Sequence, residues 1–219
     1  IAAVMRDRGI TVTERLVADI MHKNGWFSVR TNAKALYEYC ERRKENILKQ
    51  NFKAEKPNQV WVSDVTYFNY NERKLYICVI LDLYSRKVVA FKISKRNSTQ
   101  LTKATFKYAY FSRKPQDGLI FHSDNGSNYI SKSFYSYLKQ FGVIQSFSRS
   151  GRPHDNAVSE SFFKGMKAEE LYRYKYKSER EFHKSVSDYI EYYNVKRPHT
   201  FLGYLSPERY EQLYAKKSD

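Results

Sequence analysis

The sequence predicts an α/β domain with a mixed sheet flanked by helices. Three runs rich in β-branched and aromatic residues follow one another between residues 60 and 93, and they predict three successive strands. Beyond them, helical and strand patterns alternate before the chain continues as helix. Strands that first follow one another and then alternate with helices are typical of a sheet with helices packed on both faces.

Each predicted element has its own signal. The run at 75–81 is almost continuously apolar, which indicates a strand buried on both faces. The segment 148–156 is polar and contains Gly and Pro, so it predicts a loop. Strands are predicted at residues 60–68, 75–81, 87–93, 119–122 and 144–147, and helices at residues 98–112, 131–141, 157–172 and 178–194.

The residues before the sheet predict a small helical segment. The sequence opens without an initiator Met, as if inside a first short helix, so we expect a fragment of a longer protein. Gly9 ends this first helix. Thr11 and Glu14 form a possible capping box for a second helix, which Asn24 and Gly25 end. Two short helices joined by a turn suit a helix-turn-helix module, and a plain helical hairpin fits the pattern equally well.

The charge of the chain points to a polyanionic partner. The formal net charge is +16 and the pI is about 9.7, which favours binding to nucleic acid. Residues 56–160 carry the largest share, a net charge of +9. Acids are scarce in that region, so an acid kept in an apolar strand there calls for an explanation. The seven acids are Asp64, Glu72, Asp82, Asp117, Asp124, Asp155 and Glu160.

The composition excludes several classes of protein. Hydrophobic residues make up 42% of the chain, enough for a packed core and too many for global disorder. No apolar run approaches the roughly 18 residues of a membrane span and no signal peptide opens the chain, so we predict a soluble, intracellular protein with no membrane partner. Cys40 and Cys78 are too few for a disulfide framework and are expected to be reduced, buried thiols.

Three of the seven acids occupy positions that suggest chemistry. Asp64 lies in the middle of the first strand, where an unpaired carboxylate would be costly. Asp124 follows the fourth strand, at the edge where open α/β sheets bind ligands. Glu160 lies in the first turn of a helix and points away from its apolar stripe. Converging carboxylates repel one another unless hard cations such as Mg²⁺ lie between them, but each acid taken alone is more often a cap or a surface charge.

Basic and aromatic residues follow the third acid. Lys164 and Lys167 share the helix face of Glu160, so they could hold a nucleic-acid backbone beside such a site. Residues 172–177 alternate Tyr with Arg or Lys. This alternation suits stacking on bases, and it suits an amphipathic connector packed on the core equally well.

Five motifs, in this order along the chain, resemble those of one family. They are Pro57-Asn-Gln-Val-Trp-Val-Ser-Asp64-Val-Thr-Tyr67, Asp82-Leu-Tyr-Ser-Arg-Lys87, His122-Ser-Asp124-Asn-Gly126, Ser148-Arg-Ser-Gly-Arg-Pro-His-Asp-Asn156 with Ser159-Glu160, and Tyr193-Asn194 with Arg197-Pro-His199 and Leu202-Gly203. Between Asp124 and Glu160 lie 35 residues, the spacing of the D,D(35)E signature. From residue 1 to about 212, the chain resembles the catalytic subunit of the bacterial insertion-sequence-three transposases, which have a core like that of retroviral integrases.

This resemblance implies an RNase H-like fold in which Asp64, Asp124 and Glu160 are both the catalytic residues and the ligands of two Mg²⁺ or Mn²⁺ ions per active site. No zinc is expected, because the chain lacks the paired His and Cys spacing of an integrase zinc module. The candidate DNA contacts are Lys164, Lys167, Asn125, Asn156, Arg152 and Arg197.

Other matching residues are expected to have supporting roles. His122 and Gly126 flank the triad and are expected to shape the site. Asp82, a turn acid, is expected to be structural. His154 is expected to be a solvated loop residue, with contact to phosphate as the alternative, and His199 could either pin the end of the chain or touch DNA.

The sequence therefore divides into four parts. Residues 1–30 are a truncated, helix-turn-helix-like segment for DNA binding, and residues 31–56 are a basic helical linker. Residues 57–195 are the RNase H-like catalytic core, and residues 196–219 are a C-terminal tail.

The implied function is metal-dependent DNA strand cleavage and strand transfer at the ends of an insertion sequence. Its partners would be the terminal inverted repeats, the target DNA, a second copy or more of the chain, and an upstream-encoded or fused N-terminal protein. Its place would be the bacterial cytoplasm, on the nucleoid when bound to DNA. A purely hydrolytic nuclease is disfavoured by the long tail and the N-terminal helices, and an inactive DNA-binding protein by the intact triad.

Overall fold

The computed structural model describes residues 1–24, 26, 46–48, 53–148 and 156–218. The chain divides into two compact units, residues Ile1–Arg43 and Lys44–Asp219. None of the described helices is long and apolar enough to cross a membrane. The predicted linker at 31–56 falls largely outside the described residues.

The first unit contains two short helices, α1 (Ala2–Asp7) and α2 (Glu14–Lys23). Gly9 adopts a φ of 77° in the turn that follows α1, a conformation that glycine reaches without strain. The predicted capping box is wrong by two residues: Thr13 caps α2, and its hydroxyl accepts the Leu16 N–H at 3.2 Å. The helix-turn-helix interpretation stays a prediction.

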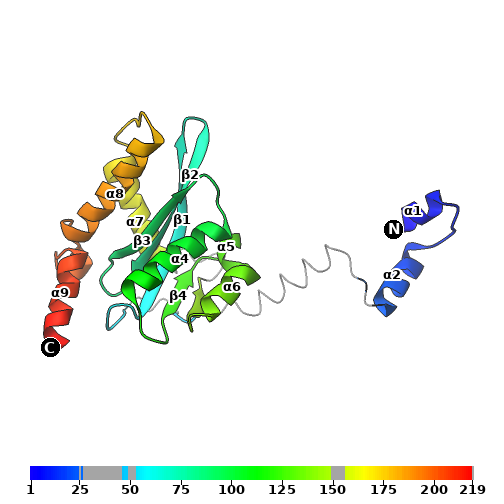
Figure 1. Ribbon diagram of the computed structural model, residues 1–219, viewed down its shortest axis with the longest axis horizontal. Coiled ribbons are helices and arrows are strands. Elements are labelled where there is room, and N and C mark those ends of the chain that lie inside the picture. The colour runs from blue at the N-terminus through cyan, green and yellow to red at the C-terminus, as the bar shows by residue number, and fades with distance from the viewer. Residues whose placement is uncertain (25, 27–45, 49–52, 149–155, 219) are drawn as a thin grey trace. The chain divides into compact units, whose positions relative to one another are not determined.

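The second unit is built on a five-stranded mixed sheet, as predicted (Figure 1). Its strands are β1 (Val60–Tyr70), β2 (Arg73–Asp82), β3 (Val88–Ser94), β4 (Ile120–Ser123) and β5 (Ile144–Phe147), in the spatial order β3-β2-β1-β4-β5. The first three are antiparallel, whereas β1, β4 and β5 are parallel. The first hairpin is tighter than predicted, because Asn71 and Glu72 both adopt positive φ and form a two-residue turn.

The described helices of this unit are α4 (Thr99–Arg113), α5 (Ser127–Ile130), α6 (Lys132–Lys139), α7 (Ala157–Met166), α8 (Glu179–Val195) and α9 (Pro207–Ser218). A π-helical turn, Lys167–Leu171, follows α7 directly, and a 3-10 turn, Thr200–Leu202, lies between α8 and α9. The helix predicted at 157–172 is therefore only partly α-helical.

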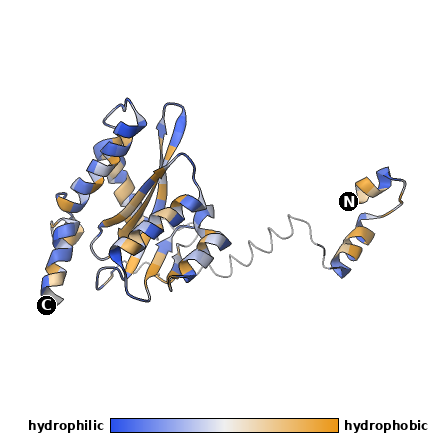
Figure 2. Cartoon of the chain, viewed as in Figure 1, coloured by the Kyte–Doolittle hydropathy of each residue, from blue (hydrophilic) through white to orange (hydrophobic). Residues whose placement is uncertain are grey.

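The two faces of the sheet bury separate apolar clusters (Figure 2). Val60 and Val62 point to the face that α7 and α8 cover, whereas Trp61 points to the face that α4 and α6 cover. This alternation follows from the two-residue period of a strand. It leaves the central strands apolar on both faces, as the run at 75–81 predicts.

The segment after α8, which the sequence suggests is a tail, packs against the core. Glu211 on α9 accepts hydrogen bonds from the Arg113 guanidinium at 2.7 and 3.0 Å and from the Ser85 hydroxyl at 2.8 Å. Asp82 lies beneath this cluster, fully buried, and accepts the backbone N–H groups of Tyr84 and Ser85. This geometry agrees with a structural role for Asp82.

Replacing Glu211 with Ala should destabilise the core. Its side chain is only 12% exposed and bridges Arg113 and Ser85, so its loss leaves a partly buried guanidinium without its carboxylate partner. We expect a loss of about 2–3 kcal/mol in the free energy of unfolding, measured by urea denaturation. Asp188→Ala, which breaks an exposed ion pair with Lys184, is the control and should cost less than about 1 kcal/mol. Equal losses in the two variants would contradict this role of Glu211.

Candidate active site

The register of the parallel strands brings two acids together. β1 and β4 pair from Val60 opposite Ile120 to Ser63 opposite Ser123, where the ladder ends. The next residue of each strand is an acid, Asp64 on β1 and Asp124 after β4. Paired strands lie about 4.8 Å apart, so these two acids lie side by side at the carboxyl end of β4, while β1 continues to Tyr70.

Asp64 carries the clearest electrostatic signal of the site. Burial and, next, the charge of Asp124 raise the pKa of its carboxyl to about 7, and Glu160 adds to this rise. The Val65 N–H, 2.7 Å from Oδ1, and the side chain of Asn156 donate hydrogen bonds that lower the pKa but do not offset the burial. The charged form of Asp64 is thus under-compensated within the protein alone.

Asp124 is held by a tight turn. Its Oδ1 accepts the Gly126 N–H at 3.0 Å, and burial raises the pKa of the carboxyl. A Cβ on Gly126 would lie 2.9 Å from Oδ1, closer than side chains ordinarily approach. Gly126 therefore leaves room for the carboxylate, which is the site-shaping role expected from the sequence.

Glu160 lies in the first turn of α7 and is exposed. It lies close enough to Asp64 to raise the pKa of that carboxyl. Among the residues that the structure describes, no three His, Cys, Asp or Glu side chains converge tightly enough to hold a metal ion. The site thus consists of an adjacent aspartate pair with a third acid across an open side.

Two asparagines line the site from below. The Asn125 amide donates to the Ser148 carbonyl at 2.8 Å. The side chain of Asn156 donates a hydrogen bond to Asp64, so Asn156 also points toward the acids. Both amide oxygens are buried and have no hydrogen-bond partner among the residues that the structure describes. Buried acceptors are normally satisfied, so these oxygens mark a place for a donor or a cation. Their predicted contact with DNA stays a prediction.

A buried polar cluster under the acids gave no signal in the sequence. The Ser63 hydroxyl lies 2.9 Å from the Tyr129 hydroxyl and donates to the Val79 carbonyl at 3.0 Å. It joins the strand of Asp64 to the short helix that follows Asp124. Cys78 lies 3.9 Å from both hydroxyls; it is a free, buried thiol, as predicted, and burial raises its pKa to about 11. Cys40 lies outside the described residues.

His122 anchors the end of β4. It is fully buried, and its Nδ1 lies 2.9 Å from the Ser146 hydroxyl on β5. The same hydroxyl accepts the Ile47 N–H at 3.1 Å. The expected site-shaping role thus has a physical basis, since His122 precedes Asp124 by two residues and ties its strand to the next.

The predicted DNA contacts lie in different surroundings. Lys164 is exposed, and the Lys167 ammonium lies 5.8 Å from the ring centre of Tyr67. Arg197 instead forms a bidentate ion pair with Glu169 at 2.6 and 2.9 Å, so its guanidinium already has an internal partner. Arg152 and His154 lie outside the described residues.

The structure bears on two other expectations that the sequence left open, those for residues 172–177 and for His199. Tyr172 and Tyr174 are exposed, but the Tyr172 ring stacks on Phe68 and Tyr176 packs edge-on against the same ring, so the alternating segment is in part a connector on the core. The His199 ring packs edge-on against Tyr193, and the backbone N–H of His199 donates to the Leu205 carbonyl at 3.2 Å. This arrangement agrees with pinning the end of the chain.

Comparison with known proteins places this geometry in a family. An integrase core domain model matches residues 54–153, and a second integrase core domain model matches residues 141–207. The transposase for insertion sequence element IS904 of Lactococcus lactis is 37% identical over 218 residues, covering 97% of this chain and 85% of that protein. Transposase InsF for insertion sequence IS3A of Escherichia coli is 38% identical over 168 residues, covering 76% of this chain and 58% of that protein.

Solved structures show the same fold. The simian T-cell lymphotropic virus intasome in complex with PP2A regulatory subunit B56 gamma contains a chain that matches with a TM-score of 0.62 and 18% identity, covering 73% of this chain and 56% of that one. The HTLV-2 integrase catalytic core domain, in complex with magnesium, matches with a TM-score of 0.59 and 17% identity, covering 73% of this chain and 99% of that one. The core thus has the RNase H-like fold of retroviral integrase catalytic cores, as predicted.

Proposed function

We propose that Asp64, Asp124 and Glu160 are the catalytic residues of this chain. The chain belongs to the insertion-sequence-three family of integrase-core transposases, which are DDE polynucleotidyl transferases that act in DNA transposition and integration. The observation that supports this most strongly is the parallel register that ends one residue before both aspartates. A chain that only bound DNA would gain nothing from setting acids side by side where its positive charge is greatest.

Enzymes with this core depend on a divalent metal, and the donors of this site fit one. Asp64 and Asp124 offer adjacent carboxylates whose repulsion a hard cation would relieve, and Glu160 offers a third carboxylate across the opening. The amide oxygens of Asn125 and Asn156, which have no partner within the described ranges, add uncharged acceptors. We propose two Mg²⁺ or Mn²⁺ ions and no zinc; bound there, they would stabilise the attacking and leaving oxygens.

The proposed reaction is direct attack on a phosphodiester. Water first frees a 3′-hydroxyl at the element end, and this hydroxyl then attacks a target phosphodiester, so one P–O bond forms as another breaks. Asp64 and Asp124, fixed by the sheet, would set the position of the reacting phosphate, and Glu160 would close the open side. Lys164 and Lys167, on the same flank of the helical segment as Glu160, would hold the backbone.

The proposed partners follow from this reaction. The net charge of +9 on residues 56–160 suits the terminal repeats and the target DNA. Joining two ends calls for a homodimer or a larger assembly on DNA, and an upstream-encoded or fused N-terminal protein would complete it. The enzyme would act in the bacterial cytoplasm, on the nucleoid.

A strand-transfer assay tests this function. The substrate is a labelled duplex that ends in the terminal repeat of the encoding element and is already cleaved at its 3′ end. We expect joined product in Mg²⁺ and none in EDTA, because the three acids cannot share a phosphate without cations. Hydrolysis without joining would identify a nuclease, and tight binding without metal-dependent chemistry would identify a DNA-binding protein; either result would contradict the proposal.

A further inference from the structure

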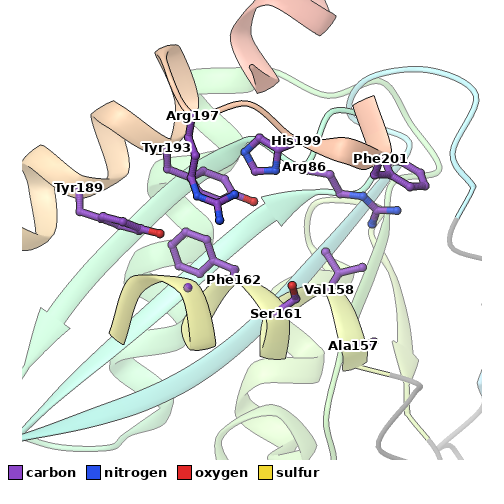
Figure 3. A pocket seen from close by; sticks show the side chains of 11 residues that line it. Arg86, Ala157, Val158, Ser161, Phe162, Tyr189, Tyr193, Arg197, His199 and Phe201 are labelled. Carbon is purple, nitrogen blue, oxygen red and sulfur yellow. The ribbon is translucent and has the colours of Figure 1, made fainter. Parts of the chain in front are cut away.

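A cavity of about 250 Å³ lies beside the helix that carries Glu160, on a flank that the proposed chemistry does not use (Figure 3). Helix α7 forms one wall with Ser161 and Phe162, and α8 forms another with Tyr193. Arg86 and the segment that carries His199 and Phe201 close it from the other side (Figure 3).

The cavity is within reach of a DNA strand bound at the acids. Ser161 follows Glu160 directly, so it projects about 100° around α7 from that carboxylate, and Gly165 lies one turn further along the same wall. Around the axis of α7, Lys164 lies between the directions of Glu160 and Ser161. A strand that passes Glu160 and Lys164 therefore runs along the rim of the cavity, and its neighbouring bases are only about 3.4 Å apart along the strand.

The lining is suited to a flat aromatic ring. Phe201 is 59% exposed on the rim, and one face of its ring lies 4.0 Å from the centre of the buried Arg86 guanidinium, which leaves the other face open. Tyr193 and Phe162 present further ring surface, packed edge to face at 4.8 Å. Aromatic faces beside a cationic group are the usual surface on which unpaired bases stack.

The polar groups of the lining can meet the edge of a base. The Ser161 hydroxyl lies on the exposed side of α7, and the buried Nε2 of His199 has no hydrogen-bond partner in the described part of the chain. Burial and the nearby Arg197 lower the pKa of His199, which keeps its ring neutral and able to accept a hydrogen bond. Arg197 is paired with Glu169, so its charge is already compensated, and the Arg86 guanidinium lies against the Phe201 ring.

We propose that this cavity receives one unstacked base of the DNA strand bound along α7, with Phe201 as the stacking surface and Ser161 and His199 at the base edge. This inference rests on the proposed function. Such a pocket would fix the register of the DNA end relative to the acids, because a single base could seat only when the scissile phosphate is in place.

Abasic substitutions test the pocket. Dissociation constants are measured by fluorescence anisotropy, in EDTA, for the full chain and duplexes in which each nucleotide near the reactive 3′ end is made abasic in turn. We expect one position where base removal weakens binding about tenfold. Phe201→Ala should weaken binding of intact DNA by a similar factor and add nothing at that one position. Tyr204→Ala, on the same turn and 72% exposed but outside the cavity, is the matched control and should leave the abasic profile unchanged.

Two results would overturn the pocket. One is a set of additive effects, in which Phe201→Ala weakens every abasic duplex as much as the intact one, as expected if the cavity held a phosphate. The other is wild-type affinity in Phe201→Ala. Ser161→Leu, which fills the cavity from an exposed helix position, should reproduce the profile of Phe201→Ala, and thermal melting shows that both variants fold. Metal-dependent strand transfer by the wild type separates failure of the pocket from failure of the proposed function.

Discussion

Asp64→Asn and Asp124→Asn should each abolish strand transfer while DNA binding persists. Each change keeps the shape of the side chain and removes the charge that would hold the cations. We expect each variant to lose about 4 kcal/mol of transition-state stabilisation, which corresponds to a rate loss of about a thousandfold. The rate is measured on the pre-cleaved duplex under single-turnover conditions, and the affinity for the same duplex is measured in EDTA.

The first of these variants, Asp64→Asn, carries a second expectation that a damaged fold would not meet. Burial and the neighbouring acids raise the pKa of Asp64 in the folded state, so its ionisation costs stability. That cost is absent at low pH and develops as the pH rises from the unfolded value through about 7. Without divalent metal at pH 8, Asp64→Asn should therefore melt no lower than the wild type. A lower melting temperature, or strand transfer near the wild-type rate, would contradict the assignment.

Gly126→Ala should reduce strand transfer about a hundredfold without unfolding the core. The backbone of Gly126 has a φ of −60°, which alanine adopts freely, so the only conflict is between its Cβ and the Asp124 carboxylate at 2.9 Å. That carboxylate is the end of a side chain and can turn away at little cost to folding. A displacement of about 1 Å at a reacting group can cost a hundredfold in rate.

Ser127→Ala is the matched control for Gly126→Ala. Ser127 is the next residue along the chain, and it is exposed at the start of α5. We expect it to keep the wild-type rate and melting temperature. If Gly126→Ala also kept the wild-type rate, then the position of the Asp124 carboxylate would not matter to the reaction.

The strands and the acids could be predicted from sequence, because their signals are local. The apolar run of β2 and the β-branched run of β1 each predict a strand from their own residues. The convergence of Asp64 with Asp124 could not be derived in that way, because it depends on the register between strands that lie about 60 residues apart. Resemblance supplied that pairing in advance, and the ladder from Val60 to Ser63 explains it.

Features that depend on tertiary contacts could not be predicted from the sequence. Ser63 and Tyr129 bear no motif, and their hydrogen bond exists only once α5 folds onto β1. The packing of the C-terminal helix has no local signal either, because its anchor, Glu211, pairs with Arg113 almost a hundred residues earlier. The pairing of Arg197 with Glu169 also has no signal in the sequence, because Glu169 lies on a π-helical turn that the periodicity does not indicate; the contact of Arg197 with DNA stays a prediction.

The most direct test of the catalytic triad concerns its most exposed member, Glu160. The measurement is the single-turnover rate of strand transfer in Mg²⁺ for the wild type, Glu160→Gln and Glu191→Gln, the last being an exposed acid of α8 with the same change of charge. The triad predicts that Glu160→Gln loses joined product by at least about a hundredfold, while Glu191→Gln joins at the wild-type rate. Equal rates in the two variants would show that chemistry proceeds without Glu160 and would contradict the three-acid site.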